Sequence, residues 1–310
     1  MKAGPVNAED GAMLDALTTE ASSSTGGPEI DQLSVTDLIA AMNERDATVA
    51  ASVRSALPTI AAAVTAATER MREGGRLIYV GAGTSGRLGV LDASEVPPTF
   101  GVDEVVVGVI AGGPAALVSA AEGAEDDEQS GADDLAALDV GPLDTVVGIA
   151  SSGRTPYVLG ALEHAAEIGA LTVGLACNLG TPLGRAADHG IEVPVGPEVV
   201  AGSTRLGAGT ATKMVLNMLS TATMVQLGRT YGSLMVDMRA NNAKLRHRAV
   251  RMVTEATGAE DATAVRALDE AGWHTKLAIA TILTGLSPTE ASQALERAGG
   301  RLRTVIEERG

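Results

Sequence analysis

The chain has 310 residues, a formal net charge of −16 at pH 7, and only one Phe, one Trp and three Tyr. The acidic balance argues against a polyanionic partner such as nucleic acid, and the scarcity of aromatic residues disfavours base-stacking platforms and aromatic sugar clefts. The single cysteine, Cys177, excludes an intrachain disulfide framework and is typical of a reducing cytosol. Because we find neither a leader pattern nor an apolar run long enough to cross a bilayer, we expect a cytoplasmic protein with no membrane contact.

The N-terminal third begins without periodicity. Residues 1 to about 30 are rich in Ser, Thr, Gly and Ala, which predicts a mobile arm. A helix is expected after Ser34, which suits an N-cap, with Asp37 in the acidic first turn. A second helical pattern covers 47–72, is interrupted at Pro58, and ends at two glycines.

The next segment carries the strongest chemical signal. An apolar, β-branched run ends in Gly81-Ala-Gly-Thr-Ser-Gly86, after which a helical pattern opens. A strand that hands over to a helix through glycines presents free backbone N–H groups and a positive dipole end, so it predicts a phosphate or other anion site. The residues concerned are Gly83, Thr84, Ser85 and Gly86, with the two hydroxyls as donors to a phosphate monoester.

The same glycines also spell G-x-G-x-x-G, so a dinucleotide site must be considered. That motif requires an acidic residue after the second strand, which we expect at 105–110. Ala111-Gly-Gly-Pro114 follows instead, without a carboxylate. This context argues against NAD.

Strand and helix patterns then alternate, which predicts a parallel sheet covered on both faces, with ligands bound beyond the carboxyl ends of its strands. The further expected strands are 105–110, 145–150, 171–176 and a weaker 191–195, and the clearest helices are 156–168 and 209–227. Beyond Arg248 the strand patterns vanish. Residues 250–310 predict three short amphipathic helices, broken at Gly258, Gly285–Pro288 and Gly299–Gly300.

Two further turns could reach the same ligand. Ala150-Ser-Ser-Gly-Arg-Thr-Pro156 repeats the order of strand, hydroxyls, glycine and helix start, so Ser151, Ser152, Gly153 and Thr155 join the candidates. A loop at 196–210 adds Ser203 and Arg205 before another helix. The guanidinium could pair with a phosphate or a carboxylate, or belong to a structural ion pair on a surface loop, and the sequence leaves these alternatives open.

The carboxylates are ambiguous from the residues alone. Glu95 precedes Pro97–Pro98, which we expect to end the helix, and a carboxylate at a helix C-terminus tends to stay protonated, as a general acid requires. The acidic run at 122–128 has the character of a solvated helix face, and spacing does not select one member. No histidine has metal-ligand spacing and no serine or cysteine forms a nucleophile elbow, so metal hydrolysis and acyl transfer drop out.

These motifs closely resemble the N-acetylmuramic acid 6-phosphate etherases over nearly the whole chain. The resemblance rests on 81–98, 121–126, 150–157, 196–205 and 234–237, on Glu29-Ile-Asp-Gln-Leu33, and on the helical tail. It implies a sugar-isomerase (SIS) fold, an α/β three-layer sandwich with a parallel five-stranded sheet, plus a small C-terminal helical module. It further implies a homodimer with active sites near the subunit interface, and no metal or organic cofactor.

The resemblance also implies the reaction, cleavage of the D-lactyl ether of N-acetylmuramic acid 6-phosphate in cell-wall sugar recycling. Glu95 matches the proton donor, Glu125 the second catalytic carboxylate and base, and Glu122 a substrate contact. The hydroxyls after the two strands match phosphate-holding positions of SIS domains. One departure stands out, because the family usually has lysine where this chain has Gly207, and Lys213 could compensate.

Two rival functions share these motifs: an aldose–ketose sugar-phosphate isomerase, and a non-enzymatic sensor similar to glucokinase regulatory proteins. Such sensors carry two SIS domains in a longer chain, whereas 310 residues without a repeat hold one. We expect an arm and helix at 1–46, a sugar-phosphate domain at 47–248 and a helical domain at 249–310.

Overall fold

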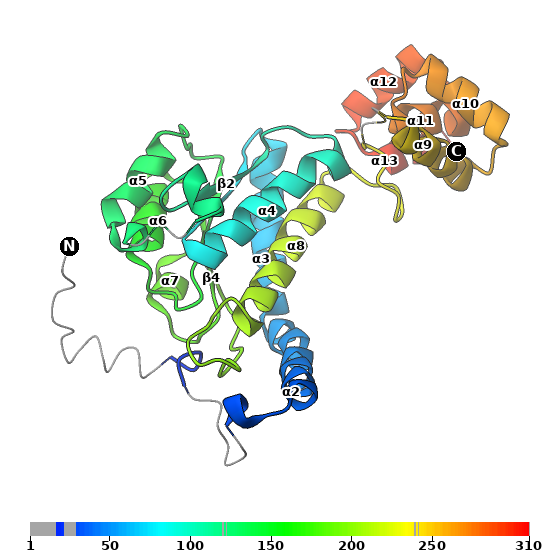
Figure 1. Ribbon diagram of the computed structural model, residues 1–310. Coiled ribbons are helices and arrows are strands. Elements are labelled where there is room, and N and C mark those ends of the chain that lie inside the picture. Colours follow the sequence, from blue (N-terminus) through cyan, green and yellow to red (C-terminus); the bar gives the residue numbers. More distant parts are fainter. Residues whose placement is uncertain are drawn as a thin grey trace. The chain divides into compact units, whose positions relative to one another are not determined.

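The computed structural model of the chain describes residues 17–21, 29–119, 121, 123–238, 240 and 242–309. It divides into two compact units (Figure 1), which we describe separately. Unit 1 takes the chain up to Ala93 and then Val106–Leu219, whereas unit 2 takes Ser94–Val105 and the chain from Ser220 onwards. The domain boundaries expected from the sequence stay a prediction.

Unit 1 is built on a five-stranded sheet with the order β2-β1-β3-β4-β5, in which every pair is parallel. The predicted fold class is therefore confirmed. The fifth strand begins two residues earlier than expected and ends three residues earlier. The strands are β1 (Leu77–Gly81), β2 (Val106–Ile110), β3 (Thr145–Ile149), β4 (Leu171–Ala176) and β5 (His189–Glu192).

Helices cover both faces of this sheet. The unit 1 helices are α2 (Val35–Ala47), α3 (Val49–Arg72), α4 (Gly83–Phe100), α5 (Glu128–Ala136), α6 (Pro156–Ile168), α7 (Pro182–Ala186) and α8 (Gly207–Gln226), of which α4 and α8 continue into unit 2. Short 3-10 helices lie at η1 (Ile30–Gln32), η2 (Pro114–Leu117) and η3 (Ala124–Asp126). Ser34 caps α2 as predicted by accepting from the N–H of Asp37, whereas α3 continues through Pro58 without the expected interruption.

Alternation along the strands explains the layers. Ile78 and Val80 of β1 pack with buried residues of α5, α6 and α7 on one face. On the other face, α4 crosses so closely that a Cβ on Gly89 would lie 3.0 Å from the Cβ of Tyr79 and 3.2 Å from a methyl of Ile149. Because successive side chains in a strand point to opposite faces, the same short apolar strands provide the packing surface for the helices on both faces of the sheet.

Helix α4 corrects one prediction. Pro97 and Pro98 were expected to end it, but the helix runs on to Phe100. Val96 is 3% exposed and Phe100 6% exposed, so the last turn carries buried apolar side chains on both sides of the prolines. Packing of an apolar face contributes most of the stability of helices in proteins, and here it outweighs the backbone bonds that the prolines remove.

The stretch Val35–Arg72 contains an 18-residue window with a mean hydropathy of 1.4, of which 33% is buried. By length and composition alone it could cross a membrane, contrary to the expectation that no such run exists. Core helices of soluble proteins meet the same criterion, and α3 buries a face that includes Val53, Ile60, Ala63 and Met71. We therefore interpret α3 as a core helix.

The predicted arm is only partly described. Residues 17–21 form a turn in which Leu17 is 3% exposed and Thr19 is fully buried. The rest of residues 1–28 lies outside the described residues. The prediction of a mobile arm is thus wrong for residues 17–21.

Beyond α8, the described residues of unit 2 form five helices where three were predicted: α9 (Ala243–Thr257), α10 (Asp261–Glu270), α11 (Thr275–Thr284), α12 (Pro288–Arg297) and α13 (Leu302–Glu307). The missed break falls at Gly272–Trp273, where both residues have positive φ angles of 60° and 63°. The guanidinium of Arg246 lies over the ring of Trp273, with its Cζ 4.6 Å from the ring centroid. Lys276, 4% exposed, donates to the carboxylate of Asp237 at 2.6 Å and so forms a buried ion pair within this unit.

Candidate functional site

The two hydroxyl-bearing turns leave neighbouring strands of the sheet. Gly81 at the end of β1 pairs with Ile149 at the end of β3. Thr84 and Ser85 therefore follow one strand end, and Ser151 and Ser152 follow the adjacent one. The structure brings together the turns that the sequence predicted to converge.

The first turn depends on close backbone approach. A Cβ on Gly86 would lie 2.6 Å from the carbonyl oxygen of Gly81, and a Cβ on Gly81 would lie 2.8 Å from the nitrogen of Gly86. Gly83 has a φ of +52°, a left-handed conformation that favours glycine. The turn thus starts α4 immediately after the strand, with Thr84 half-buried and Ser85 8% exposed.

The second turn has the same construction. Gly153 has a φ of +65°, and a Cβ there would lie 2.4 Å from the Cβ of Thr181. The Oγ of Ser152 accepts from the N–H of Arg154 at 3.2 Å. Thr155 precedes α6 but makes no capping bond through its side chain, so its hydroxyl is not used to cap the helix.

The third loop reaches the first turn through the start of α8. A Cβ on Gly209 would lie 3.8 Å from the Cγ2 of Thr84, so the helix N-terminus lies against that residue. Ser203 is half-buried and Arg205 is exposed. Arg205 takes no part in the ion pairs formed among the described residues, so the sequence alternatives for its partner remain predictions.

A buried carboxylate that the sequence analysis did not single out caps α8. Glu198 is fully buried, and its two oxygens accept from the N–H groups of Gly207 at 2.9 Å and Ala208 at 2.8 Å. Negative charge is stabilised at a helix N-terminus, which explains why a buried glutamate is tolerated there. Only its place before a glycine-rich helix start could have identified this role.

Gly207 lies between this carboxylate and a cation. A Cβ at this position would be 3.1 Å from the Oε2 of Glu198 and 3.5 Å from an Nη of Arg45. Arg45 also donates to the carbonyls of Val195 and Pro197. Its guanidinium therefore occupies the space next to the position where the resemblance noted from the sequence leads us to expect lysine.

Lys213 has a different partner. Its ammonium lies 3.1 Å from the buried carboxylate of Asp92, which also accepts from the hydroxyl of Tyr79 at 3.0 Å. If Lys213 were to take the place of the lysine expected at position 207, as predicted, it would have to give up this ion pair with Asp92.

The two predicted catalytic carboxylates differ in setting. Glu95 is exposed on α4, five residues before the helix ends and within the part of that helix assigned to unit 2. Its predicted place at the helix C-terminus is therefore wrong. Glu125 is exposed in η3, and the expected acidic helix is also wrong, because α5 starts only at Glu128 with Asp127 as its N-cap. Glu122 lies outside the described residues.

Cys177 connects the second turn with α8. Its N–H donates to the carbonyl of Ser151 at 2.9 Å, and its Sγ contacts the carbonyl oxygen of Ala208 at 3.6 Å. Burial raises the pKa of this thiol to about 11, so it stays protonated and inert at neutral pH. Its role is packing.

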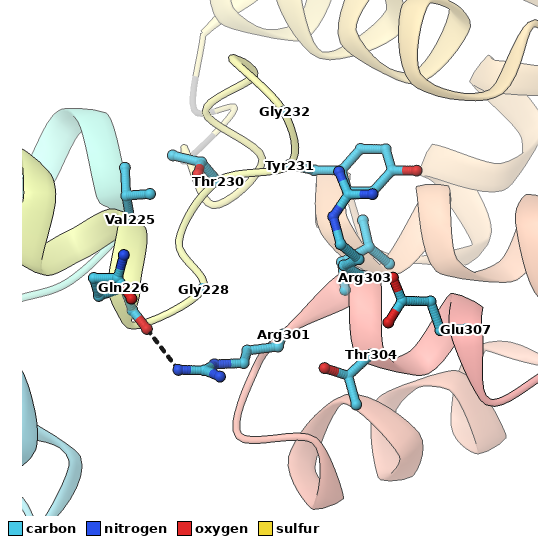
Figure 2. A pocket seen from close by; sticks show the side chains of 11 residues that line it. Val225, Gln226, Gly228, Thr230, Tyr231, Gly232, Arg301, Arg303, Thr304 and Glu307 are labelled. Carbon is cyan, nitrogen blue, oxygen red and sulfur yellow. Dashed lines mark hydrogen bonds between the residues drawn. The ribbon is translucent and has the colours of Figure 1, made fainter.

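We also searched the described residues for a metal site and for a cavity outside the predicted site. Within the described ranges, no group of three His, Cys, Asp or Glu side chains gathers as metal ligands. Unit 2 has a cavity of about 380 Å³ between the chain after α8 and helix α13, shown in Figure 2. Arg301 donates across it to the carbonyl of Gln226 at 2.9 Å, and Arg303 lies over the ring of Tyr231 at 5.3 Å. None of the predicted site residues lines this cavity.

Comparison with known families agrees with this geometry. The model of the glucokinase regulatory protein N-terminal SIS domain matches residues 59–166, and the SIS domain model matches 124–222. The fold and these matches therefore define a SIS-domain protein. Among solved structures, a phosphoheptose isomerase from Francisella tularensis is 21% identical, with a TM-score of 0.49 over 62% of this chain and 100% of that chain.

Curated relatives narrow the family. The N-acetylmuramic acid 6-phosphate etherase of Mycolicibacterium smegmatis is 57% identical over 94% of this chain and 98% of its own length. That of Streptomyces avermitilis is 56% identical over 95% of both chains. The chain belongs to the N-acetylmuramic acid 6-phosphate etherase family.

Proposed function

We propose that this protein cleaves the D-lactyl ether of N-acetylmuramic acid 6-phosphate, giving N-acetylglucosamine 6-phosphate and D-lactate. The observation that carries the proposal is 57% identity to an etherase over almost the full length of both chains. The paired hydroxyl turns at neighbouring strand ends support a phosphate-bearing substrate. The presence of a single cysteine, typical of proteins in a reducing compartment, supports a cytoplasmic location.

The chemistry follows from the open-chain aldehyde. The C1 carbonyl acidifies the hydrogen on C2, and the lactyl oxygen on C3 is β to that carbonyl. A base removes the C2 proton, the C3–O bond breaks, and an acid protonates the departing lactate oxygen. Water then adds at C3 of the unsaturated aldehyde and a proton returns to C2, so the sum of the steps is hydrolysis of the ether.

We assign Glu95 as the acid, Glu125 as the base and Glu122 as a substrate contact. Two carboxyl groups with different pKa values are a common arrangement for such proton transfers. We assign the phosphate to the turns after β1 and β3, through Thr84, Ser85, Ser151, Ser152 and Thr155, with backbone groups at Gly83, Gly86 and Gly153. Ser203 and Arg205 complete the proposed substrate contacts.

We also propose a homodimer. No residue of α2 is buried within the chain, and Val35, Ile39 and Met42 are 74%, 60% and 36% exposed on one face of it. Spacings of four and three residues place these side chains in one apolar stripe, which a second copy would cover. Light scattering on the wild type and on Ile39→Glu tests this, since the variant should be monomeric.

Incubation with N-acetylmuramic acid 6-phosphate in deuterated water tests the reaction. We expect release of D-lactate together with deuterium at C2 of the sugar. Deuterium exchange without lactate would favour the isomerase, and tight binding with neither signal would favour the sensor.

A further inference from the structure

The turn at residues 17–21 is joined to the predicted site by a buried amide. Asn178, two residues beyond the end of β4, is 2% exposed, and Thr19 is fully buried. The Nδ2 of Asn178 donates to the Oγ1 of Thr19 at 3.1 Å, and its Oδ1 accepts from the N–H of Thr19 at 3.4 Å. The Oγ1 of Thr18 makes a third contact with that Oδ1 at 3.0 Å.

The same amide holds the second phosphate turn. Asn178 Nδ2 also donates to the carbonyl of Ser151 at 2.9 Å. Ser151 is the first hydroxyl residue after β3, so its backbone position sets the direction in which Ser152 and Gly153 follow. Thr19 is therefore one side chain away from the turn after β3.

Thr19 also holds the third loop. Its carbonyl accepts from the N–H of Gly202 at 3.1 Å, next to Ser203. Gly202 has a φ of +74°, and a Cβ there would lie 2.6 Å from a carboxylate oxygen of Glu20. The turn at 17–21 thus fits tightly against this loop.

We propose that Thr19 is a positioning residue for the sugar-phosphate site, acting through Asn178 on the Ser151 turn and through Gly202 on the 196–210 loop. This inference rests on the proposed function for the identity of the ligand. Two segments that lie about fifty residues apart in the sequence are held by one buried threonine. Buried polar groups in such networks are costly to leave unpaired, so loss of the hydroxyl displaces the turn.

The test compares Thr19→Val, which keeps the side-chain volume but removes the hydroxyl, with Thr19→Ser, which keeps the hydroxyl. Thr65→Val is the matched control, because Thr65 is exposed on α3 and its hydroxyl bonds only its own helix at Ala61. The readouts are Kd for N-acetylglucosamine 6-phosphate by calorimetry, KM and kcat for lactate release, and Tm.

We expect Thr19→Val to raise Kd and KM roughly tenfold, as loss of one buried hydrogen bond implies, with little change in kcat. Thr19→Ser should restore binding, and Thr65→Val should match the wild type. Unchanged Kd in Thr19→Val, or a lower Tm without a change in Kd, overturns the proposal. If Thr19→Val does not fold, the exposed Thr18→Val should raise Kd by a smaller factor, and an unchanged Kd there overturns it equally.

Because Kd needs no turnover, the two proposals are separable. Wild-type protein that binds the sugar phosphate but releases no lactate refutes the reaction and leaves the Thr19 test intact. Wild-type protein that binds neither the sugar phosphate nor inorganic phosphate refutes both.

Discussion

The carboxylate of Glu198 accepts a hydrogen bond of 2.9 Å from the backbone N–H of Gly207, at the first residue of α8. The protein's own negative charge therefore occupies the N-terminus of this helix, which would otherwise attract an anion. We expect the phosphate of the substrate to bind the turns after β1 and β3 instead.

Replacing Glu198 with Gln should destabilise the fold. One of the two N–H groups of α8 would then face an amide NH₂, and a buried donor without an acceptor costs about 1–3 kcal/mol. Urea unfolding measures the loss. Glu163→Gln, an exposed change on α6, serves as the control and should stay close to the wild type.

Replacing Gly207 with lysine, the residue that the sequence resemblance leads us to expect there, should also cost stability. The new Cβ would lie unusually close to Glu198, at 3.1 Å, and the rest of the side chain would start 3.5 Å from Arg45; overpacking of this kind costs about 1–3 kcal/mol. In a double-mutant cycle with Arg45→Ala, the combined loss should be smaller than the sum of the single losses. Additive losses would mean that Arg45 does not occupy the space of the lysine.

The variant Glu95→Gln should release no lactate while still binding the sugar phosphate, because an amide cannot protonate the departing oxygen. Glu125→Gln should in addition lose deuterium exchange at C2. Glu163→Gln again provides a matched exposed control. Full activity in either variant would remove that residue from the mechanism.

Ser85→Ala and Ser152→Ala should raise KM more than they lower kcat, since a hydroxyl that holds the phosphate binds ground state and transition state alike. Steady-state lactate release gives both constants. The opposite pattern would mean that these hydroxyls act on the transition state.

Acid stability should depend on Asp144, which accepts from the backbone N–H and the guanidinium of Arg76 at 2.8 and 2.7 Å. Burial opposes the charged form, but the bonds from Arg76 and Gly141 outweigh it and hold the pKa of Asp144 below its ordinary value of 3.8. The stabilisation is complete above the unfolded-state pKa and is lost as the pH falls through the lower folded-state value.

Asp144→Asn should therefore cost about 1–3 kcal/mol at pH 7, and the difference from wild type should shrink as the pH drops below about 4. Urea midpoints across this pH range measure it. Exposed Asp46→Asn is the control, and a difference independent of pH would contradict the assignment.

The sheet was predictable because its strands are short, continuous apolar runs bounded by glycines, and four of the five were located to within one residue. The two hydroxyl turns were predictable for the same reason, since each must follow a strand end. Local rules failed where packing decided the outcome. Burial of Val96 and Phe100 carries α4 past Pro97 and Pro98, and no local pattern marks this.

Long-range hydrogen bonds could not be predicted from the sequence either. Thr19 and Asn178 are 159 residues apart in sequence, and neither stands in a recognisable motif. Glu198 was noticed only as part of a longer motif, because capping by a residue nine positions before the helix depends on the path of the intervening loop.

The position of Trp273, the only tryptophan of the chain, has a practical consequence. It belongs to unit 2, whereas Tyr79 and Tyr157, both fully buried, belong to unit 1. Tryptophan emission therefore monitors the melting of the helical unit alone, and circular dichroism in the aromatic region adds the signal of Tyr79 on β1 and Tyr157 on α6. Recorded on the same sample, the two signals reveal whether the units unfold in one transition or in two.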